Sequence, residues 1–365
     1  MMPSVVRFRD LSVPDDERAE LLAAIDGVLA GGQIILGAAV EEFEAEFAHA
    51  CGTAHAIGVS DGTGSLYLAL RALGIGPGDE VIVPTMSWVA SANAVVALGA
   101  TPVFVDVDDH YTISPEATEA EITPRTKAIM PVHFYGRMAQ MPAIMTLAKR
   151  TGVRVVEDAS QAFGASLAGH PAGSFGDLSG FSLNPMKPLA ALGEAGAVVT
   201  NDADQAEHIR SLRYLGTINR ETCVDPSLNF KIDTLQAVIL RHRMRRVAGI
   251  VKRRNAIARR YNEALADVVQ VPQIPTDGVS AFFDYTIWCA DRDRLESSLN
   301  GQGIEVKVRH RELLSDQPGY RTSRSGDIAN ARRLVAGILC LPIHEALSEA
   351  DQDRVVGAIR SFYGS

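Results

Sequence analysis

The sequence predicts an α/β protein, with a mostly parallel central sheet in a large domain and a smaller α+β domain at the C-terminus. From residue 55 onwards, short apolar runs alternate with amphipathic stretches. Strands and helices that alternate in this way are typical of a parallel sheet covered on both faces. The 365 residues are enough for two domains. We expect a large domain over residues 1–245 and a small domain over residues 246–365.

The large domain is expected to begin with two helices, at PDDERAELLAAIDGVLA and VEEFEAEFAHA. Buried strands are then predicted at HAIGV, EVIVP, PVFVDV, AIMPVHF and VRVVED, and helices at LYLALRALG, WVASANAVVALG and MPAIMTLAKRTG. The pattern changes at LSGFSL and AGAVVT, two strand-like runs without a full helix between them. Ligands of such sheets bind outside the carboxyl ends of the strands, so the loops that follow the strands are expected to carry the site.

The rest of the chain starts with a long helical pattern from about Asp233 to Leu265. It continues with AFFDYTIWCA, a helix near residues 292–302, GIEVKV and a closing helix at SEADQDRVVGAIRSFY. This order of elements predicts the smaller α+β domain.

Composition excludes several classes of protein. The formal net charge of −9 argues against a general nucleic-acid or membrane-surface binder, because both need a positive field. The four cysteines lie far apart without a CxxC pair, which favours neither a disulfide framework nor a metal site. The first residues lack the apolar region of a signal peptide, and no run of about 18 apolar residues occurs. We therefore expect a cytoplasmic protein.

The segment VSDGTGSLYLAL predicts a site for a phosphate group. A strand ends here, Asp61 to Ser65 form a turn, and a helix begins. The backbone N–H groups at a helix start bind anions, and Gly62 and Gly64 let the backbone approach closely, beside the hydroxyl of Thr63. An ordinary capped turn is the alternative.

Two further strand ends carry side chains suited to a planar cofactor. Trp88 follows a strand and opens a helix, where its ring could stack on a ligand; the alternative is a core tryptophan. Glu157 and Asp158 end a buried strand, with Gln161 shortly beyond. A carboxylate is costly to bury alone, and a protonated ring nitrogen would pair with it. The alternative is that Asp158 caps a following helix.

A candidate reactive amine lies between the two strand-like runs of residues 178–200. Lys187 stands there among Gly, Ala, Pro and Met, five residues after Ser182. Burial lowers the pKa of an amine and makes it available for Schiff-base chemistry. Ser182 could donate to a phosphate, whereas a solvated surface lysine is the ordinary alternative. Asn229 precedes the helix that Asp233 is expected to cap, and a simple turn is its alternative role.

Taken in order, these segments resemble the DegT/DnrJ/EryC1/StrS family, pyridoxal 5'-phosphate (PLP)-dependent aminotransferases that act on keto sugars and related cyclitols. The resemblance covers nearly the whole chain. It is carried by GGQIILGAAVEEFEAEFA, SDGTGSLYLALRALGIGPGDEVIVPTMSWVASANAVVALGATPVFVDVD, PVHFYG, VVEDASQAFGA, GSFGDLSGFSLNPMKPLAALGEAGAVVT, NFKIDTLQAVIL and ILCLPIHEALSEAD.

The resemblance implies fold type I of the PLP-dependent transferases and a homodimer with shared active sites. It also implies a role for each candidate residue. Lys187 would form the Schiff base and move the proton, Asp158 would pair with the pyridinium nitrogen, Gln161 would lie beside the ring hydroxyl, and Trp88 would stack on the ring. The phosphate would be held by Gly62, Thr63, Gly64 and Ser182, and by Asn229 from the neighbouring subunit.

The implied activity is transfer of an amino group from glutamate or glutamine to a keto sugar or keto-cyclitol, in natural-product or surface-sugar biosynthesis. A PLP-dependent dehydratase or eliminating enzyme of the same family, and a non-catalytic homologue, are the alternatives. The sequence departs from the usual family pattern at Asn184–Pro188, at Lys231, where arginine is common, and over residues 308–320. These departures concern the substrate pocket.

Overall fold

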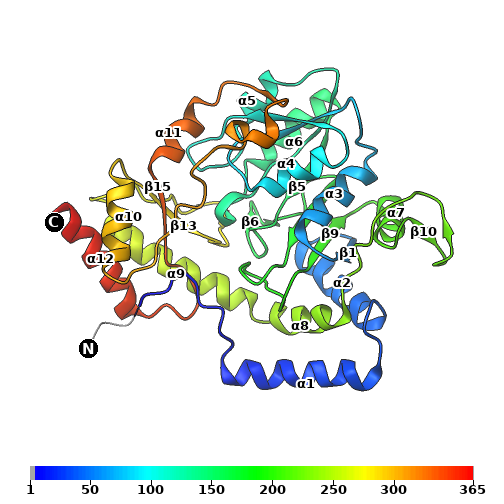
Figure 1. The fold of residues 1–365 in the computed structure, drawn as a ribbon, viewed down its shortest axis with the longest axis horizontal. Helices are drawn as coiled ribbons and strands as arrows, with labels where there is room; N and C mark the ends of the chain where they lie inside the picture. The colour runs from blue at the N-terminus through cyan, green and yellow to red at the C-terminus, as the bar shows by residue number, and fades with distance from the viewer. Residues whose placement is uncertain (1–4, 365) are drawn as a thin grey trace.

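An eight-stranded sheet forms the centre of the larger lobe (Figure 1), in the order β1-β9-β8-β5-β4-β2-β3-β14. The computed structural model describes residues 5–364. All neighbouring strands are parallel except β9, which runs antiparallel to both β1 and β8. The strands are β1 (His55–Val59), β2 (Glu80–Pro84), β3 (Thr101–Val105), β4 (Thr126–Ile129), β5 (Arg154–Asp158), β8 (Leu178–Ser182), β9 (Gly196–Thr200) and β14 (Arg324–Ser325).

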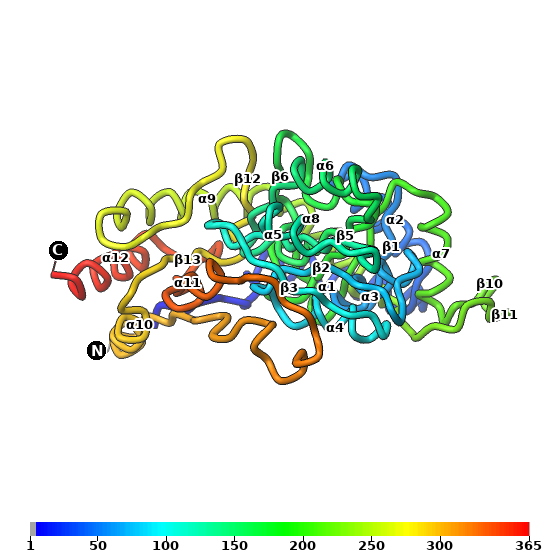
Figure 2. The backbone as a smooth tube through the Cα atoms, turned by 90° about the horizontal axis from the view of Figure 1, so that it is seen from above, coloured from blue at the N-terminus to red at the C-terminus, as the bar shows by residue number. Residues whose placement is uncertain are grey.

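Both faces of this sheet are buried under helices, as Figure 2 shows from above. Successive strand residues point to opposite faces, so Ile82 joins one core and its neighbours Val81 and Val83 join the other. One core includes side chains of α2, α6 and α8, and the other includes side chains of α3, α4 and α7. These helices are α2 (Ala38–Cys51), α3 (Gly62–Ala72), α4 (Val89–Val96), α6 (Met141–Thr151), α7 (Ala203–Arg213) and α8 (Thr234–Met244).

The smaller lobe is built on an antiparallel pair, β13 (Tyr285–Trp288) with β15 (Ile338–Leu341). Its core gathers side chains from α9 (Val247–Leu265), α10 (Arg292–Gly301) and α12 (Glu349–Tyr363). Val6 also belongs to this lobe, because it bridges to Ile304 and is buried in this core.

The remaining elements connect or flank the two lobes. They are α1 (Asp15–Gly31), α5 (Pro115–Ala120), α11 (Ala329–Gly337), the short helices η1 (Phe134–Gly136), η2 (Leu314–Asp316) and η3 (Pro318–Tyr320), the hairpin β10 (Thr217–Ile218) with β11 (Thr222–Cys223), and a small sheet of β12 (Gly278–Val279), β6 (Ser166–Leu167) and β7 (His170–Pro171). No helix within residues 5–364 combines the length and the apolar character needed to cross a bilayer.

The predicted fold class is confirmed, and one local prediction, the long helix, was wrong. The long helix expected from Asp233 to Leu265 is two helices, because α8 packs on the large sheet whereas the second half of α9 packs in the small lobe. The segment GIEVKV forms only isolated bridges, at Ile304 and Lys307. Edge strand β14 was not expected, since its two polar residues carry no apolar pattern. The domain division at residue 245 stays a prediction.

Candidate active site

The segments that follow β1, β2, β5 and β8 meet at the carboxyl ends of these strands. β5 lies beside β8, with Asp158 opposite Gly180. The helix that follows β2 reaches Asp158 through a hydrogen bond from Ser91, and the helix that follows β1 packs directly on Ser182. The sheet therefore brings the candidate cofactor residues of four separate segments to one edge.

The first turn of α3 lies against the end of β8. Asp61 caps this helix, with its Oδ1 accepting from the Gly64 N–H at 2.7 Å. The helix begins at Gly62, so the predicted turn over Asp61–Ser65 is already helical. A Cβ at Gly62 would lie 2.4 Å from the Ser182 Cβ, so only glycine allows this approach. The exposed Thr63 and half-buried Ser182 stand at the rim of this helix start.

Asp158 is a buried carboxylate held only by neutral groups. It is 4% exposed, and its Oδ2 accepts from the Ser91 hydroxyl at 2.6 Å while Oδ1 accepts from the Ser160 N–H at 3.1 Å. Across residues 5–364 it forms no ion pair with lysine or arginine. The alternative role of Asp158 as a helix cap is not realised, since the chain forms turns after β5. A cationic ring nitrogen would supply the charge that this carboxylate lacks.

Glu157, the neighbouring carboxylate, is engaged elsewhere. His133 Nε2 lies 2.8 Å from its Oε2, and the Phe175 and Gly176 N–H groups donate to Oε1 at 2.8 and 2.7 Å. Burial acts to raise the pKa of Glu157, but these partners together hold it below its ordinary value. Glu157 therefore holds the loop before β8 in place. Asp158 is then the carboxylate at this strand end that is available to pair with a cationic ligand group.

Trp88 and Gln161 flank this strand end. Trp88 is 59% exposed at the start of α4, so the core alternative for this ring was wrong. An exposed tryptophan face at a ligand-binding edge is suited to stacking. Gln161 is buried, and its Oε1 accepts from the Tyr135 N–H at 2.7 Å. This bond fixes the orientation of the amide.

Lys187 lies in the loop between β8 and β9 and is half-buried. Its Nζ is 4.5 Å from the centroid of the Phe283 ring. Burial lowers the pKa of Lys187 to about 8, against the charges of Asp158 and Asp284, which raise it. A lower pKa makes the neutral, nucleophilic form of this amine more accessible near neutral pH than in a solvated lysine.

Asn229 lies beside the α3 end of this site. Its side chain is exposed, and its Oδ1 accepts from the Lys231 N–H at 3.3 Å. The adjacent Phe230 packs on the helix start, since a Cβ at Gly64 would lie 2.8 Å from its Cδ1. The role of Asn229 in a neighbouring subunit stays a prediction.

Several residues near Lys187 and Asp158 were not foreseen. Ser91 lies one helical turn after Trp88, and this spacing was the available signal. Arg9, Asp284 and Arg309 come from segments far apart in the sequence, and only the packing of the small lobe brings them to Lys187. No sequence pattern links them.

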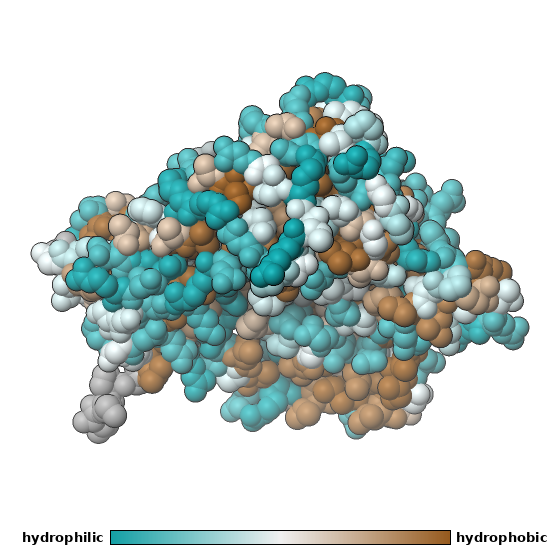
Figure 3. Space-filling view, turned by 45° about the horizontal axis from the view of Figure 1, so that its top comes forward, coloured by the Kyte–Doolittle hydropathy of each residue, from teal (hydrophilic) through white to brown (hydrophobic). Residues whose placement is uncertain are grey.

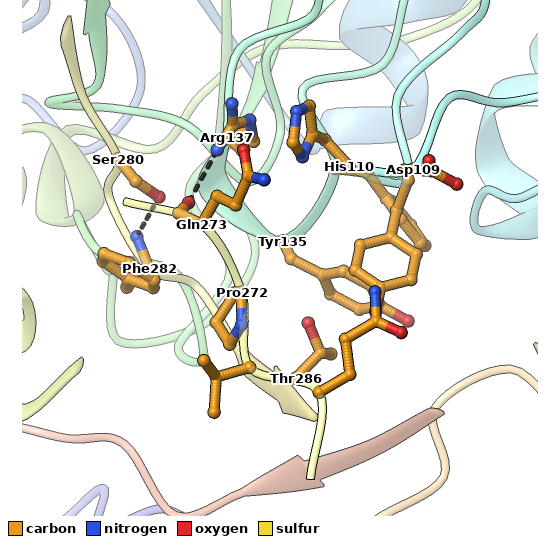
Figure 4. A pocket seen from close by; sticks show the side chains of 13 residues that line it. Asp109, His110, Tyr135, Arg137, Pro272, Gln273, Ser280, Phe282 and Thr286 are labelled. Atoms are coloured by element: carbon orange, nitrogen blue, oxygen red, sulfur yellow. Dashed lines mark hydrogen bonds between the residues drawn. The ribbon is translucent and has the colours of Figure 1, made fainter. Parts of the chain in front are cut away.

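Cavities open on two sides of this region. Lys187 lines one of about 330 Å³ with Arg9 and Arg254, and Trp88 lines one of about 240 Å³ with Arg309 and His310. Another cavity of about 210 Å³, drawn in Figure 4, lies where the segment of Tyr135 and Arg137 meets residues 270–286. No residue of the predicted site lines this last cavity.

Comparison with known proteins identifies the family. The model of the DegT/DnrJ/EryC1/StrS aminotransferase family matches residues 15–360. This chain belongs to that family. The resemblance found in the sequence is therefore confirmed, as is the prediction of a PLP-dependent aminotransferase.

Individual members of the DegT/DnrJ/EryC1/StrS family are similar over most or all of their length. A dTDP-3-amino-3,4,6-trideoxy-alpha-D-glucose transaminase of Streptomyces venezuelae is 40% identical, over 98% of this chain and 96% of that protein. A crystal structure of DesV from S. venezuelae with a ketimine intermediate has a TM-score of 0.96 and 39% identity, covering all of both chains. NtdA from Bacillus subtilis, with bound PMP, has a TM-score of 0.94 and 29% identity, covering 100% of this chain and 86% of NtdA.

The residues of this family member fit a PLP group. In the described part of the chain no cation pairs with the Asp158 carboxylate, the Trp88 ring is largely exposed, and Lys187 lies close enough to Asp158 for that charge to affect its pKa. The start of α3 offers backbone N–H groups to a phosphate, with Ser182 against them. Each chemical part of the cofactor thus has a matching group at this edge of the sheet.

Proposed function

We propose that this chain transfers an amino group from glutamate or glutamine to a keto sugar or keto-cyclitol, with PLP as cofactor. The observation that carries the proposal is the buried carboxylate of Asp158, which forms no ion pair within residues 5–364 and is near enough to Lys187 for its charge to act on that amine. Relatives named as aminotransferases of UDP-linked sugars, besides the dTDP-sugar transaminase, support the acceptor class. Biosynthesis of natural products or of surface sugars is the corresponding setting.

Bound at this site, PLP would supply an aldehyde that bonds to amines and a ring that withdraws electrons from the adjacent carbon. Asp158 would keep the ring nitrogen protonated, because a buried carboxylate stabilises a neighbouring cation. The Ser91 hydroxyl holds that carboxylate in place at 2.6 Å. Lys187 Nζ, neutral in part near pH 8, would take a proton from the substrate carbon and return it.

Binding and orientation would fall to other residues. The first turn of α3, with Gly62, Thr63 and Gly64, would bind the phosphate together with the Ser182 hydroxyl. Trp88 would cover one face of the ring, and Gln161, oriented by Tyr135, would lie at its hydroxyl. These residues would hold the phosphate, the ring face and the ring hydroxyl of the cofactor, within reach of Lys187.

We also propose that two copies of the chain form a dimer with shared active sites, in which Asn229 reaches the phosphate of the neighbouring copy. Exposed apolar side chains support this interface, and several of them adjoin the site. They are Leu22, Leu29, Ile34, Ile35, Met186, Leu192 and Leu228. Figure 3 shows apolar surface gathered at the lower right of the molecule, the part where Figure 1 places α1.

The proposal is tested by labelling Lys187. Purified protein incubated with PLP should absorb visible light, and borohydride should abolish this absorption and leave a label on Lys187. Glutamate or glutamine should change the spectrum, and a panel of keto sugars and cyclitols should restore it. The Lys187→Ala variant should lose at least about 1000-fold in turnover, because it lacks both the nucleophile and the proton carrier.

Substitution of another lysine provides the control. Lys149→Ala, on the surface of α6, should keep wild-type turnover. Full turnover by Lys187→Ala would refute the proposal. A spectrum that does not respond to any amino donor would favour a binding protein instead.

A further inference from the structure

Three cationic side chains surround one aromatic ring beside the candidate active site. Lys187 Nζ lies 4.5 Å from the centroid of the Phe283 ring, and the Cζ atoms of Arg9 and Arg309 lie 4.4 and 5.2 Å from it. Arg9 comes from the start of the chain and Arg309 from the small lobe. Both guanidinium groups are near enough to Lys187 for their charges to act on its amine.

A single carboxylate faces the two arginines. Asp284 is fully buried; its Oδ1 accepts from Arg9 Nη2 at 2.7 Å, and its Oδ2 accepts from Arg309 Nε at 3.0 Å. The nearby Arg254 has its own partner, Glu345, at 2.7 Å. Within residues 5–364 neither guanidinium group forms an ion pair with a carboxylate other than Asp284, so one positive charge has no counterion there. Burying such a charge is unfavourable unless an anion joins it.

Arg9 also has an unused hydrogen-bond donor. Its side chain is only 8% exposed, and its Nε has no partner among the described residues. Its Nη2 is engaged by Asp284 and by the carbonyl of Phe283. Arg9 lines the same cavity as Lys187, so the orphan donor and the excess charge lie beside space that a ligand can enter.

The cluster of Arg9, Arg309 and Asp284 is chemically suited to bind a carboxylate group of a ligand. A guanidinium group binds a carboxylate through two parallel N–H groups and remains charged when buried. In an amino-acid donor the α-carboxylate is on the carbon that bears the amino group, so it must lie close to Lys187. The diphosphate of a nucleotide-linked sugar is separated from the ketone carbon by several atoms of the sugar ring, which places it farther away.

We propose that Arg9 and Arg309, held in place by Asp284, form the subsite for the α-carboxylate of the amino-acid donor. The inference rests on the proposed transaminase function and adds the residues that select the donor. Asp284 is a positioning residue, because it touches the two arginines and not the donor. The subsite selects amino acids over simple amines.

The test compares donor and acceptor saturation in the PLP-loaded enzyme. Arg9→Gln and Arg309→Gln should each raise the half-saturating concentration of glutamate about 10- to 100-fold, the usual effect of losing a charged hydrogen bond. The half-saturating concentration of the keto-sugar acceptor should change less than about 3-fold. Arg9→Lys keeps a cation beside Asp284 and should fall between wild type and Arg9→Gln.

Two measurements guard against loss of folding. Arg292→Gln is a matched control, because Arg292 is a similarly buried arginine, 10% exposed and paired with Asp293 at 2.6 Å, outside this cluster. It should keep wild-type donor saturation. Calorimetry measures the binding of glutarate, a dicarboxylate that is not turned over, and of the neutral glutaramide for comparison. The affinity for glutarate should fall in Arg9→Gln by the same factor by which the half-saturating concentration of glutamate rises.

The outcomes separate this inference from the proposed function. If the half-saturating concentration of the donor is unchanged in the arginine variants while the enzyme remains active, the carboxylate subsite is refuted and the proposed function is not. The same holds if only the half-saturating concentration of the acceptor rises. Glutarate binding that depends on Arg9, in a wild-type enzyme that transfers no amino group, would support the subsite and refute the transaminase proposal.

Discussion

Lys187 is governed by opposing local effects. Removal from water favours its neutral form, and the positive charges of Arg9 and Arg309 act in the same direction. Asp158 and Asp284 oppose them by stabilising the ammonium form. The resulting pKa of about 8, against an ordinary value of 10.5, leaves an amine that is reactive near neutral pH and can still carry a proton.

This balance predicts the pH dependence of cofactor attachment. Only the neutral amine bonds to the PLP aldehyde, so the rate of attachment to cofactor-free protein should rise with pH and level off above about pH 8. Asp284→Asn removes a charge that raises the pKa of Lys187. The midpoint of the pH dependence of PLP attachment should therefore lie at lower pH in this variant than in the wild type. Stopped-flow absorbance measures the attachment rate of both proteins.

The exposed Asp267, which pairs with Arg360 in the small lobe, supplies the comparison. Asp267→Asn should keep the wild-type midpoint. A wild-type midpoint near pH 10.5 would show that Lys187 behaves as a solvated lysine.

At the scale of the element, the site depends on how closely α3 approaches β8. The Asp61 side chain caps the helix, and Gly62 lets its first turn rest on the end of the strand. Its N–H groups point at a fixed position because the helix packs along both β8 and β9. A rigid helix start is a better anion site than a mobile loop, since its donors are already aligned.

Gly62→Ala should disturb this approach. The new Cβ would meet the Ser182 Cβ at 2.4 Å and the Ser182 Cα at 2.9 Å, so the helix must move away from the strand. We expect a loss of about 1–3 kcal/mol in the free energy of unfolding, as in other overpacked sites. We also expect PLP to bind at least about 10-fold more weakly. Urea unfolding and equilibrium dialysis measure the two effects.

Gly249→Ala in α9 is the matched control. A Cβ there meets nothing within 4 Å, so the substitution should be neutral or slightly stabilising and should leave PLP affinity unchanged. Equal behaviour of the two variants would contradict the role given to the contact between Gly62 and Ser182.

At the scale of the whole molecule, the site forms where the two lobes and the first residues of the chain converge. The N-terminal segment joins the small lobe through the bridge from Val6 to Ile304 and reaches the site with Arg9. The large sheet supplies Asp158, whereas the small lobe supplies Asp284 and Arg309. Relative displacement of the lobes would therefore move the proposed donor subsite relative to the proposed cofactor site.

The proposed dimer gives a prediction at this scale. Leu22→Glu with Leu29→Glu places two charges on the exposed apolar face of α1, where the side chains are 59% and 61% exposed. In a dimer that buries this face, the charges would be desolvated, so the variant should sediment as a monomer and lose most of its activity. Analytical ultracentrifugation measures the change.

Val5→Glu is the control, because Val5 is 57% exposed but belongs to the segment beside the small lobe. It should sediment like the wild type. A double variant that remains a dimer with full activity would exclude α1 from the interface.

Much of the large lobe was predictable because local patterns decide it. Apolar runs such as EVIVP and VRVVED are buried on both faces, and strand–helix alternation permits few other arrangements. The candidate residues followed from the same logic, since carboxyl ends of parallel strands meet at one edge. The break between α8 and α9 was missed, because each half packs in a different lobe and the pattern of apolar residues is continuous across it.

The sequence by itself determined the fold class, the family and the position of Asp158 at a strand end and of Lys187 and Trp88 in the segments that follow strands, since these depend on short-range patterns. Only the tertiary structure decided what surrounds Lys187. Arg9, Phe283 and Arg309 have no fixed spacing in the chain, and their charges act through space once packing excludes water. The electrostatic character of the site is therefore a property of the folded molecule.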